Sequence, residues 1–321
     1  MMIRSHITAV ACSALAIGLV ACGGGGGDSS GPANTPPANS KAKIDDKNAK
    51  QVTRSAAKSA NASSNGADLG KGAFDTVDPS VINPGAPVLP TARSLAIKAI
   101  EETGGTEPCA GGGTINFAFE GIPTTPGDLL GAMVVTAVNC VDEGVTSNGV
   151  MRLSDLQVDT GRIGAAISFD SFSVIDPSEQ VNSTLKGTTT FLIETTSSNT
   201  QKTTFGVRDL QVTESGVVSL IPKLDTVIEV DTATNVATTS LSGTLNTPQG
   251  VVDLITEKPF VSLGDLNPTA GQLKIVGELS SVTLVPRLDG ETVDLQIDTA
   301  DADPGIDVIT PATWDEVGRL F

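Results

Sequence analysis

The feature that most constrains the fold is an alternation of apolar with polar residues, at a period of two, that recurs from about residue 114 onward. Successive side chains of a strand point to opposite faces, so this pattern gives each strand one apolar and one polar face. Turn-forming clusters separate the alternating stretches at spacings too short for crossover helices, which predicts antiparallel hairpins. The clearest alternations are Ile115, Phe117 and Phe119; Met133, Val135 and Ala137; Ile163, Ala165, Ile167 and Phe169; Val282 and Leu284; and Val293, Leu295 and Ile297.

The pattern predicts an all-β fold, an antiparallel meander of about 11 or 12 strands. Glycine falls inside three of the expected strands, at Gly187, Gly243 and Gly277. Interior glycines mark bulges or sharp bends, or are simply weak strand residues. With bends, the sheet is expected to be strongly curved or closed and barrel-like, and a two-sheet β-sandwich is the alternative.

One or two short helices are expected beside the sheet. Residues Thr91–Glu102 place Leu95 and Ala99 on one helical face, before a pair of glycines. Residues Thr313–Leu320 have Thr313 as a candidate N-cap with Glu316 three residues later, which is the capping-box spacing. Trp314 and Val317 would then face the core.

The first residues have the pattern of a secretory signal. One basic residue, Arg4, precedes an apolar run from Ile7 to Ala21, which is too short for the roughly 20 residues of a membrane-spanning helix. Residues Leu19-Val20-Ala21-Cys22 resemble the lipobox of bacterial lipoproteins. The resemblance implies that residues 1–21 are removed and that a lipid is attached to Cys22. Gly23, in place of aspartate, implies an outer-membrane lipoprotein, on the periplasmic face or at the cell surface.

Residues 22–72 are rich in Gly, Ser, Pro and Lys. Such a composition predicts a disordered tether, because it cannot bury enough apolar surface to offset the entropy of ordering. Basic residues gather at Lys41–Lys58, where they are either attracted to an anionic lipid surface or merely solubilise the spacer. Residues 73–321 are expected to form the all-β domain.

Charge and composition exclude several classes of function. From Gly72 onward the chain has 33 acidic and 12 basic residues, a net charge of −21, which repels nucleic acid. The single histidine, His6, lies in the signal. The processed chain therefore has no Ser-His-Asp triad and no histidine-ligated metal site.

Four cysteines have separate expected fates. Cys12 leaves with the signal and Cys22 receives the lipid, so Cys109 and Cys140 remain as an even pair in an exported chain. A disulfide between these two residues is the default expectation.

A cluster of acidic residues near the C-terminus suggests a weak calcium loop as a minor hypothesis. Asp298, Asp301, Asp303 and Asp307 surround Gly305, and calcium binds several carboxylate and carbonyl oxygens. Pro304 and the lack of a closing glutamate depart from the usual pattern, so a solvated acidic loop is the simpler interpretation. No other cofactor is expected.

The domain as a whole resembles uncharacterised β-rich lipoproteins of Gram-negative bacteria. The residues that carry the resemblance are Cys109–Gly113, Pro126–Asp128, Asn139-Cys140, Asn148-Gly149, Thr256–Phe260 and Thr313-Trp314. That group has no established activity, so the resemblance implies no catalytic residues.

Two hypotheses of function follow. The first is a membrane-tethered envelope lipoprotein without enzymatic activity, a binding or structural module for an apolar ligand or an envelope protein partner. The alternative is a carboxylate-dependent enzyme that acts on an envelope glycan, because so many acids always offer some pair at a suitable separation. The chain has no Tyr and one Trp, which disfavours sugar stacking and hence the enzyme.

Overall fold

The structure is a computed structural model of the whole chain. It describes residues 40–58, 60, 104–120, 132–142, 144–159, 161–177, 181–214, 217–264, 266–299 and 305–318. The expected signal, the candidate lipid site at Cys22 and the expected helix at Thr91–Glu102 lie outside these residues.

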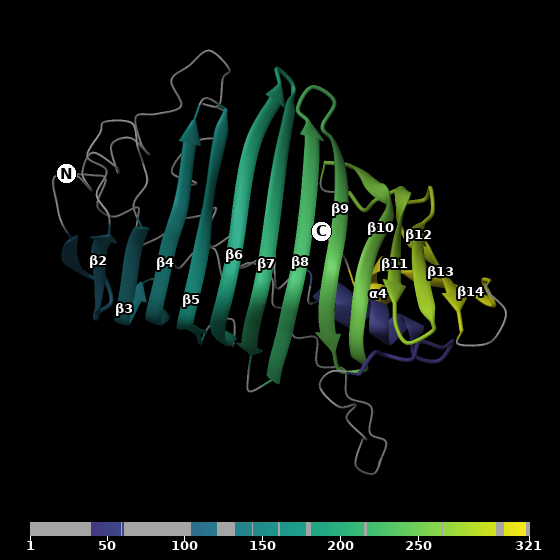
Figure 1. Cartoon of the computed structure of the whole chain (residues 1–321), viewed down its shortest axis with the longest axis horizontal. Coiled ribbons are helices and arrows are strands. Elements are labelled where there is room, and N and C mark those ends of the chain that lie inside the picture. Colours follow the sequence, from purple (N-terminus) through teal and green to yellow (C-terminus); the bar gives the residue numbers. More distant parts are fainter. Residues whose placement is uncertain are drawn as a thin grey trace, which may run out of the picture.

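The described residues form one antiparallel sheet of fourteen strands in which each strand pairs with the next along the sequence (Figure 1). The strands are β1 (Gly104–Pro108), β2 (Thr114–Glu120), β3 (Ala132–Asp142), β4 (Val145–Asp159), β5 (Arg162–Asp176), β6 (Val181–Ser197), β7 (Thr200–Glu214), β8 (Val217–Asp231), β9 (Val236–Thr247), β10 (Gly250–Leu263), β11 (Ala270–Val276), β12 (Ser281–Pro286), β13 (Thr292–Asp298) and β14 (Val308–Thr313).

The all-β meander predicted from the sequence is therefore confirmed, whereas the expected 11 or 12 strands were too few. The sheet is open, since β1 pairs with β2 and β14 with β13, and the two end strands do not pair with one another. All fourteen strands belong to this one sheet, so the alternative of a two-sheet sandwich is wrong for the described residues.

One face of the sheet, here called the inner face, holds the apolar core. The predicted alternation at Val293, Leu295 and Ile297 is confirmed, because all three side chains are fully buried. Cross-strand pairing continues this face from strand to strand. Its buried residues include Ala165, Ile167, Phe191, Val207, Leu224, Leu241, Leu254, Leu273, Ile275, Val282 and Leu284.

Left-handed residues other than glycine lie at register shifts in four strands, in β4 at Asp155 and in three strands where they separate two buried apolar residues. These three are Asn139 in β3, Ser171 in β5 and Asp209 in β7, with φ values of 44°, 52° and 50°. Each lies at a register shift between neighbouring strands. Such β-bulges insert one residue, so the buried residues on either side stand three apart instead of two. These pairs are Ala137 and Cys140, Phe169 and Phe172, and Val207 and Leu210.

Gly187 shows why one of the interior glycines is required. Its φ is 126°, and a Cβ at this position would lie 2.4 Å from the carbonyl oxygen of Asp209 in the neighbouring strand. Of the alternatives left open for this glycine, a bulge is the one found, because the register with β7 shifts between Lys186 and Thr188, and a side chain there would collide with backbone.

Residues 40–58 and Ala60, here called the N-terminal segment, pack against the C-terminal half of the sheet. The segment starts as an extended strap at residues 40–44 and continues as a helix over residues 49–58, drawn in purple in Figure 1. Asp45 caps this helix, because its carboxylate accepts the backbone N–H groups of Lys47 and Asn48.

The prediction of a disordered tether as far as residue 72 is wrong for this segment. Its alanine, valine and isoleucine side chains are all buried, two in the strap and the others at helical spacing in the helix, so they add to the core of the sheet. They are Ala42, Ile44, Ala49, Val52, Ala56, Ala57 and Ala60.

A second helix, α4 (Trp314–Val317), follows β14. Thr313 accepts the backbone N–H of Glu316, and the Glu316 carboxylate accepts the N–H of Thr313, which is the predicted capping box. Trp314 and Val317 are buried, as expected. The described helix ends before Gly318 rather than at Leu320.

Candidate functional site

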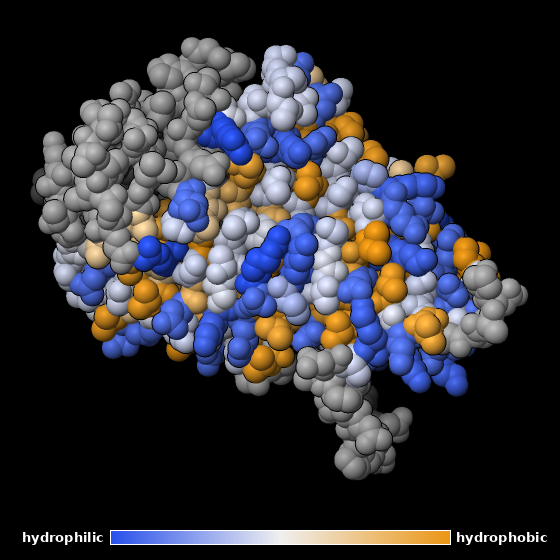
Figure 2. Space-filling model, viewed as in Figure 1, coloured by the Kyte–Doolittle hydropathy of each residue, from blue (hydrophilic) through white to orange (hydrophobic). Residues whose placement is uncertain are grey.

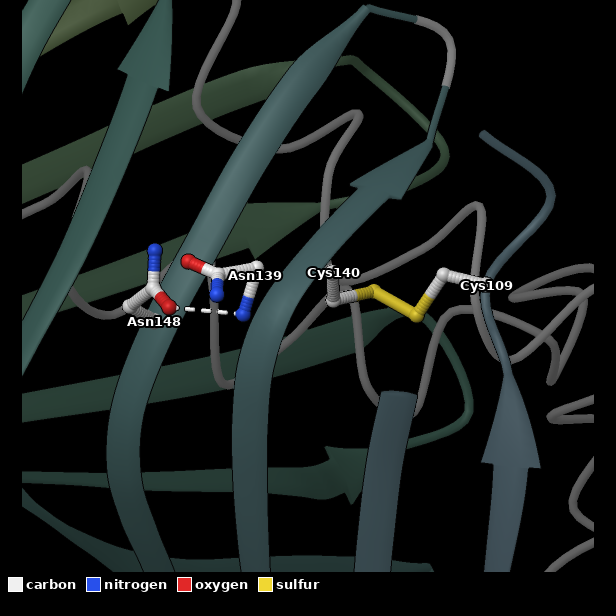
Figure 3. Close-up of a disulfide and its surroundings, with 4 residues drawn as sticks. All are labelled: Cys109, Asn139, Cys140 and Asn148. Carbon is white, nitrogen blue, oxygen red and sulfur yellow. Dashed lines mark hydrogen bonds between the residues drawn. A yellow bond between two sulfur atoms is a disulfide. The ribbon is translucent and has the colours of Figure 1, made fainter. Parts of the chain in front are cut away.

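The predicted disulfide is present between Cys109 and Cys140, whose Cα atoms are 5.4 Å apart (Figure 3). It joins the turn between β1 and β2 to β3. The neighbouring Asn139 has a left-handed backbone, and its N–H donates to the side-chain oxygen of Asn148 in β4 at 2.6 Å. The disulfide and the bulge together fasten the first four strands.

The four aspartates of the candidate calcium loop are only partly described. Asp298 ends β13 and Asp307 precedes β14, while Asp301 and Asp303 lie outside the described residues. The carboxylate of Asp307 accepts both the hydroxyl and the backbone N–H of Thr299 at 2.6 Å, and these bonds lower its pKa. Among the described residues, no three His, Cys, Asp or Glu side chains are grouped to hold a metal. Calcium binding stays a prediction without support from this part of the chain.

Carboxyl groups with a clearly shifted pKa serve turns and helix caps. The pKa of Asp289 is lowered by the hydroxyl and backbone N–H of Thr292, and that of Asp231 by the backbone N–H of Ala233. The pKa of Glu316 is lowered chiefly by the ammonium group of Lys50. A general acid needs the opposite shift, so these carboxylates are explained by local structure and not by catalysis.

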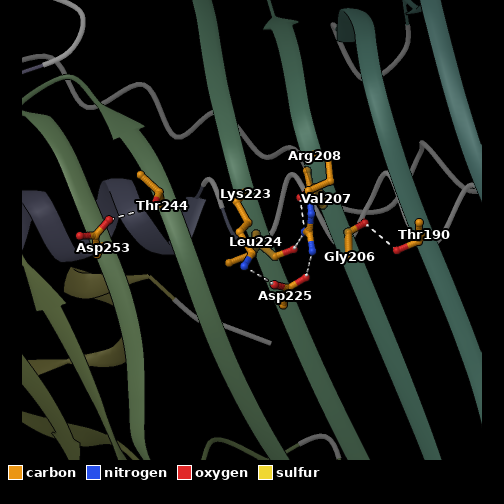
Figure 4. Close-up of polar contacts among 9 residues, drawn as sticks. All are labelled: Thr190, Gly206, Val207, Arg208, Lys223, Leu224, Asp225, Thr244 and Asp253. Atoms are coloured by element: carbon orange, nitrogen blue, oxygen red, sulfur yellow. Dashed lines mark hydrogen bonds and ion pairs between the residues drawn. The ribbon is translucent and has the colours of Figure 1, made fainter.

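The face opposite the inner face, here called the outer face, is polar, and several of its charges are paired. Arg208 in β7 donates to Asp225 in β8 at 2.7 Å, and Lys223 lies 3.4 Å from the same carboxylate (Figure 4). Further ion pairs join Lys202 in β7 to Glu229 in β8, and Arg162 in β5 to Glu194 in β6. On the face that Figure 2 shows, hydrophilic side chains separate small apolar areas over the middle strands. Such pairs contribute little stability but keep the surface soluble.

The inner face holds two hydroxyl groups that lack partners within the described part of the chain. Thr189 lies between Ile167 and Val207 in neighbouring strands, and Ser183 lies further along β6. Both side chains are buried, and their oxygen atoms form no hydrogen bond there. Buried polar groups are normally satisfied, so these hydroxyls offer unused hydrogen-bonding capacity in apolar surroundings.

The N-terminal segment occupies a fitted site at the C-terminal half of the sheet. The N–H of Ala42 donates to the carbonyl of Val251 in β10 at 2.9 Å. The N–H of Val251 in turn donates to the carbonyl of Ser40 at 2.8 Å. The carbonyl of Ala42 then accepts the N–H of Glu278, in the turn between β11 and β12. The strap thereby bridges two neighbouring parts of the sheet.

The basic residues of this segment face acidic residues of the domain. Lys41 pairs with Asp253, Lys50 pairs with Glu316 at 2.7 Å, and Lys43 lies 3.9 Å from Glu278. From the sequence, these basic residues were expected either to be attracted to an anionic lipid surface or to keep the spacer soluble. The contacts add a third role, because they hold the segment against an otherwise acidic domain.

Residue periodicity is the sequence signal that could have found the segment. Buried positions 49, 52, 53, 56, 57 and 60 follow the spacing of an amphipathic helix. Most of them are alanine, which adds little to hydropathy but has the highest helix propensity.

In comparisons with known proteins, no family model, no curated protein and no solved structure matches the chain. The resemblance to lipoproteins thus stays a prediction. Within the described residues, none of the helices combines the length and the apolar character needed to cross a membrane.

Proposed function

We propose that this protein is a lipid-anchored binding module of the bacterial cell envelope that has no catalytic site and holds an apolar ligand on the inner face of its sheet. The anchor is the lipid on Cys22, and the outer membrane is the proposed location. A disulfide in the domain supports export, because such bonds persist in oxidising compartments.

The observation that carries the ligand proposal is the pair of unpartnered hydroxyls, Ser183 and Thr189, on an apolar face. Ligand sites are mostly apolar with a few polar groups that fix orientation. Partly buried side chains extend this surface around the core. They are Met133, Met151, Ile193, Phe205 and Val212.

The test is extraction of the native protein, purified from its own membranes, with organic solvent and mass spectrometry of the extract. We expect an apolar compound in constant molar ratio to the protein. Thr189→Val keeps the side-chain volume and removes the hydroxyl, so it should lower that ratio. Thr188→Val, on the neighbouring outer-face position, should leave the ratio unchanged.

A native protein that yields no such compound would contradict the ligand proposal. The anchor is tested separately with Cys22→Ser, which should accumulate as unprocessed precursor without lipid. If this variant still matures and fractionates with membranes as the native protein does, the anchor proposal is wrong.

A further inference from the structure

The end of the sheet where the N-terminal segment enters carries an unusually exposed leucine. Leu279, in the turn between β11 and β12, is 86% exposed and has a left-handed backbone with φ 54°. A bulky residue is unfavourable in that region, where glycine or asparagine is usual. Strain of this kind persists only where the surroundings enforce it, and it gathers at functional positions.

The strap of the N-terminal segment holds this turn in place. The N–H of Glu278 donates to the carbonyl of Ala42 at 2.6 Å, and the N–H of Ile44 donates to the hydroxyl of Ser280 at 2.9 Å. Both neighbours of Leu279 are therefore bonded to the strap, while its own side chain projects into solvent. A second apolar side chain, Ile306, is 56% exposed beside β14 at the same end.

The same end is where the chain leaves toward Cys22. Residues 23–39 separate Cys22 from Ser40, and 17 residues span at most about 60 Å when fully extended. The strap is thus the part of the described fold nearest in sequence to the proposed lipid. Leu279 is held beside this strap by hydrogen bonds of its two neighbours, so a bilayer that holds the lipid is the apolar surface closest at hand.

Charge at this end also favours a lipid surface. The N-terminal segment has six basic and two acidic residues in a chain of net charge −17. Lys43 is 79% exposed and Lys47 also faces solvent. Of the acidic groups nearby, Asp253 pairs with Lys41, Asp307 accepts hydrogen bonds from Thr299, and Glu278 lies 3.9 Å from Lys43. This reduces the repulsion that the rest of the domain would suffer at an anionic leaflet.

We propose that this end of the sheet is a membrane-contact surface, in which Leu279 enters the apolar layer of the bilayer while Lys43 and Lys47 lie at the headgroups. The proposal rests on the proposed lipid anchor at Cys22. It fixes the orientation of the domain, with β11–β14 upright on the membrane and their opposite ends directed away.

The opposite end supplies the rival surface. Leu288, in the turn between β12 and β13, is 89% exposed, and six-residue β12 places it roughly 20 Å from Leu279. Its charged neighbours are Asp289 and Glu291, which are acidic and exposed, and Arg287, which pairs with Asp294. Exposure alone does not distinguish the two leucines, whereas the strap, followed along the chain by the exposed Lys43 and Lys47, lies at the Leu279 end of the described structure.

The experiment compares three labelled variants of the full-length lipidated protein, Leu279→Cys, Leu288→Cys and Ser242→Cys. Ser242 is an exposed outer-face position in the middle of β9. Each variant is labelled with an environment-sensitive fluorophore and reconstituted in vesicles of phosphatidylcholine and phosphatidylglycerol. We expect a blue shift of the emission, and its quenching by a lipid-borne quencher, for the Leu279→Cys label only. Adding Lys43→Gln and Lys47→Gln should diminish both signals, as should high salt.

Each outcome is decisive. Quenching at Leu288→Cys instead of Leu279→Cys would reverse the orientation and overturn the proposal. Vesicle-bound protein with three equal signals would overturn it too, while leaving the lipid anchor intact. Native protein that does not float with vesicles would overturn both the anchor and this inference.

Discussion

At the scale of single residues, Leu279 offers a direct test of backbone strain. Replacing it with glycine removes the left-handed penalty and loses almost no buried surface, because the side chain is exposed. We expect Leu279→Gly to be more stable than the parent by about 1 kcal/mol in urea unfolding, net of glycine's greater freedom in the unfolded chain. Leu288→Gly is the control, and it should not stabilise. A loss of stability in Leu279→Gly would show that the turn is unstrained.

Gly277 tests how closely the strap approaches the sheet. A Cβ at this position would lie 2.1 Å from the carbonyl oxygen of Ala42, so backbone must move. We expect Gly277→Ala to cost roughly 1–3 kcal/mol and to make the chain near Ser40 more sensitive to protease. Gly105→Ala in β1 is the matched control, because nothing lies within 4 Å of its Cβ position. Equal stability of the two variants would contradict the contact.

At the scale of elements, the sequence predicted short strands better than long ones. The simple alternation at Val293–Ile297 held because β13 is regular. The longest strands, β4–β8, have 15 to 17 residues, and bulges break their period. Val207 and Leu210 are both buried although they stand three apart, because Asp209 is the inserted residue. An interpretation that requires strict alternation splits such a strand in two at the bulge. Sequence spacing alone did not distinguish a bulge from a turn.

The helix of the N-terminal segment was missed for a different physical reason. Its buried face is made largely of alanine, and its exposed face of lysine, within a stretch whose average composition resembles a spacer. Alanine contributes little burial per residue, so the sheet must supply the complementary apolar surface before the helix is stable. The residues that face the segment lie about 200 positions or more away, as Val251 does from the strap and Gly318 from Ala57 of the helix, and local patterning does not reveal them.

The capping box of α4 makes a pH-dependent contribution. Lys50 and the N–H of Thr313 lower the pKa of Glu316 relative to the unfolded chain. Because the pKa of Glu316 is lower in the folded protein, its ionised carboxylate stabilises the fold at pH values above the unfolded-chain pKa, near 4.5. This stabilisation is lost as the pH falls through the folded-state pKa. We expect Lys50→Gln to raise the pKa of Glu316 in an NMR titration and to lessen the loss of stability on acidification. Lys47→Gln is the control, and an unshifted Glu316 in Lys50→Gln would refute the pairing.

At the scale of the whole molecule, an open sheet has two ends that need support. The disulfide between Cys109 and Cys140 ties the β1–β2 turn to β3, and the N-terminal segment covers part of the core beside β10–β14. The sequence predicted the first fastening from cysteine count alone. It did not predict the second, nor the unpartnered hydroxyls of Ser183 and Thr189, because both depend on which strands become neighbours.

Two variants should therefore weaken opposite ends of the same sheet. Replacing both cysteines, Cys109→Ala with Cys140→Ala, opens a loop with a sequence separation of 31 and should cost roughly 3–4 kcal/mol on the chain-entropy model. In hydrogen exchange, amide protection should fall first in β1–β4.

Deleting residues 40–60 should instead expose the core beside β10–β14. The burial of Ile44 and of Val52 alone contributes about 1.5–3 kcal/mol each to stability. Deleting residues 23–39 removes none of the contacts described above and serves as the control. If the disulfide variant and the 40–60 deletion lose protection uniformly across the sheet, then the two ends unfold as one unit and the fastenings are not independent.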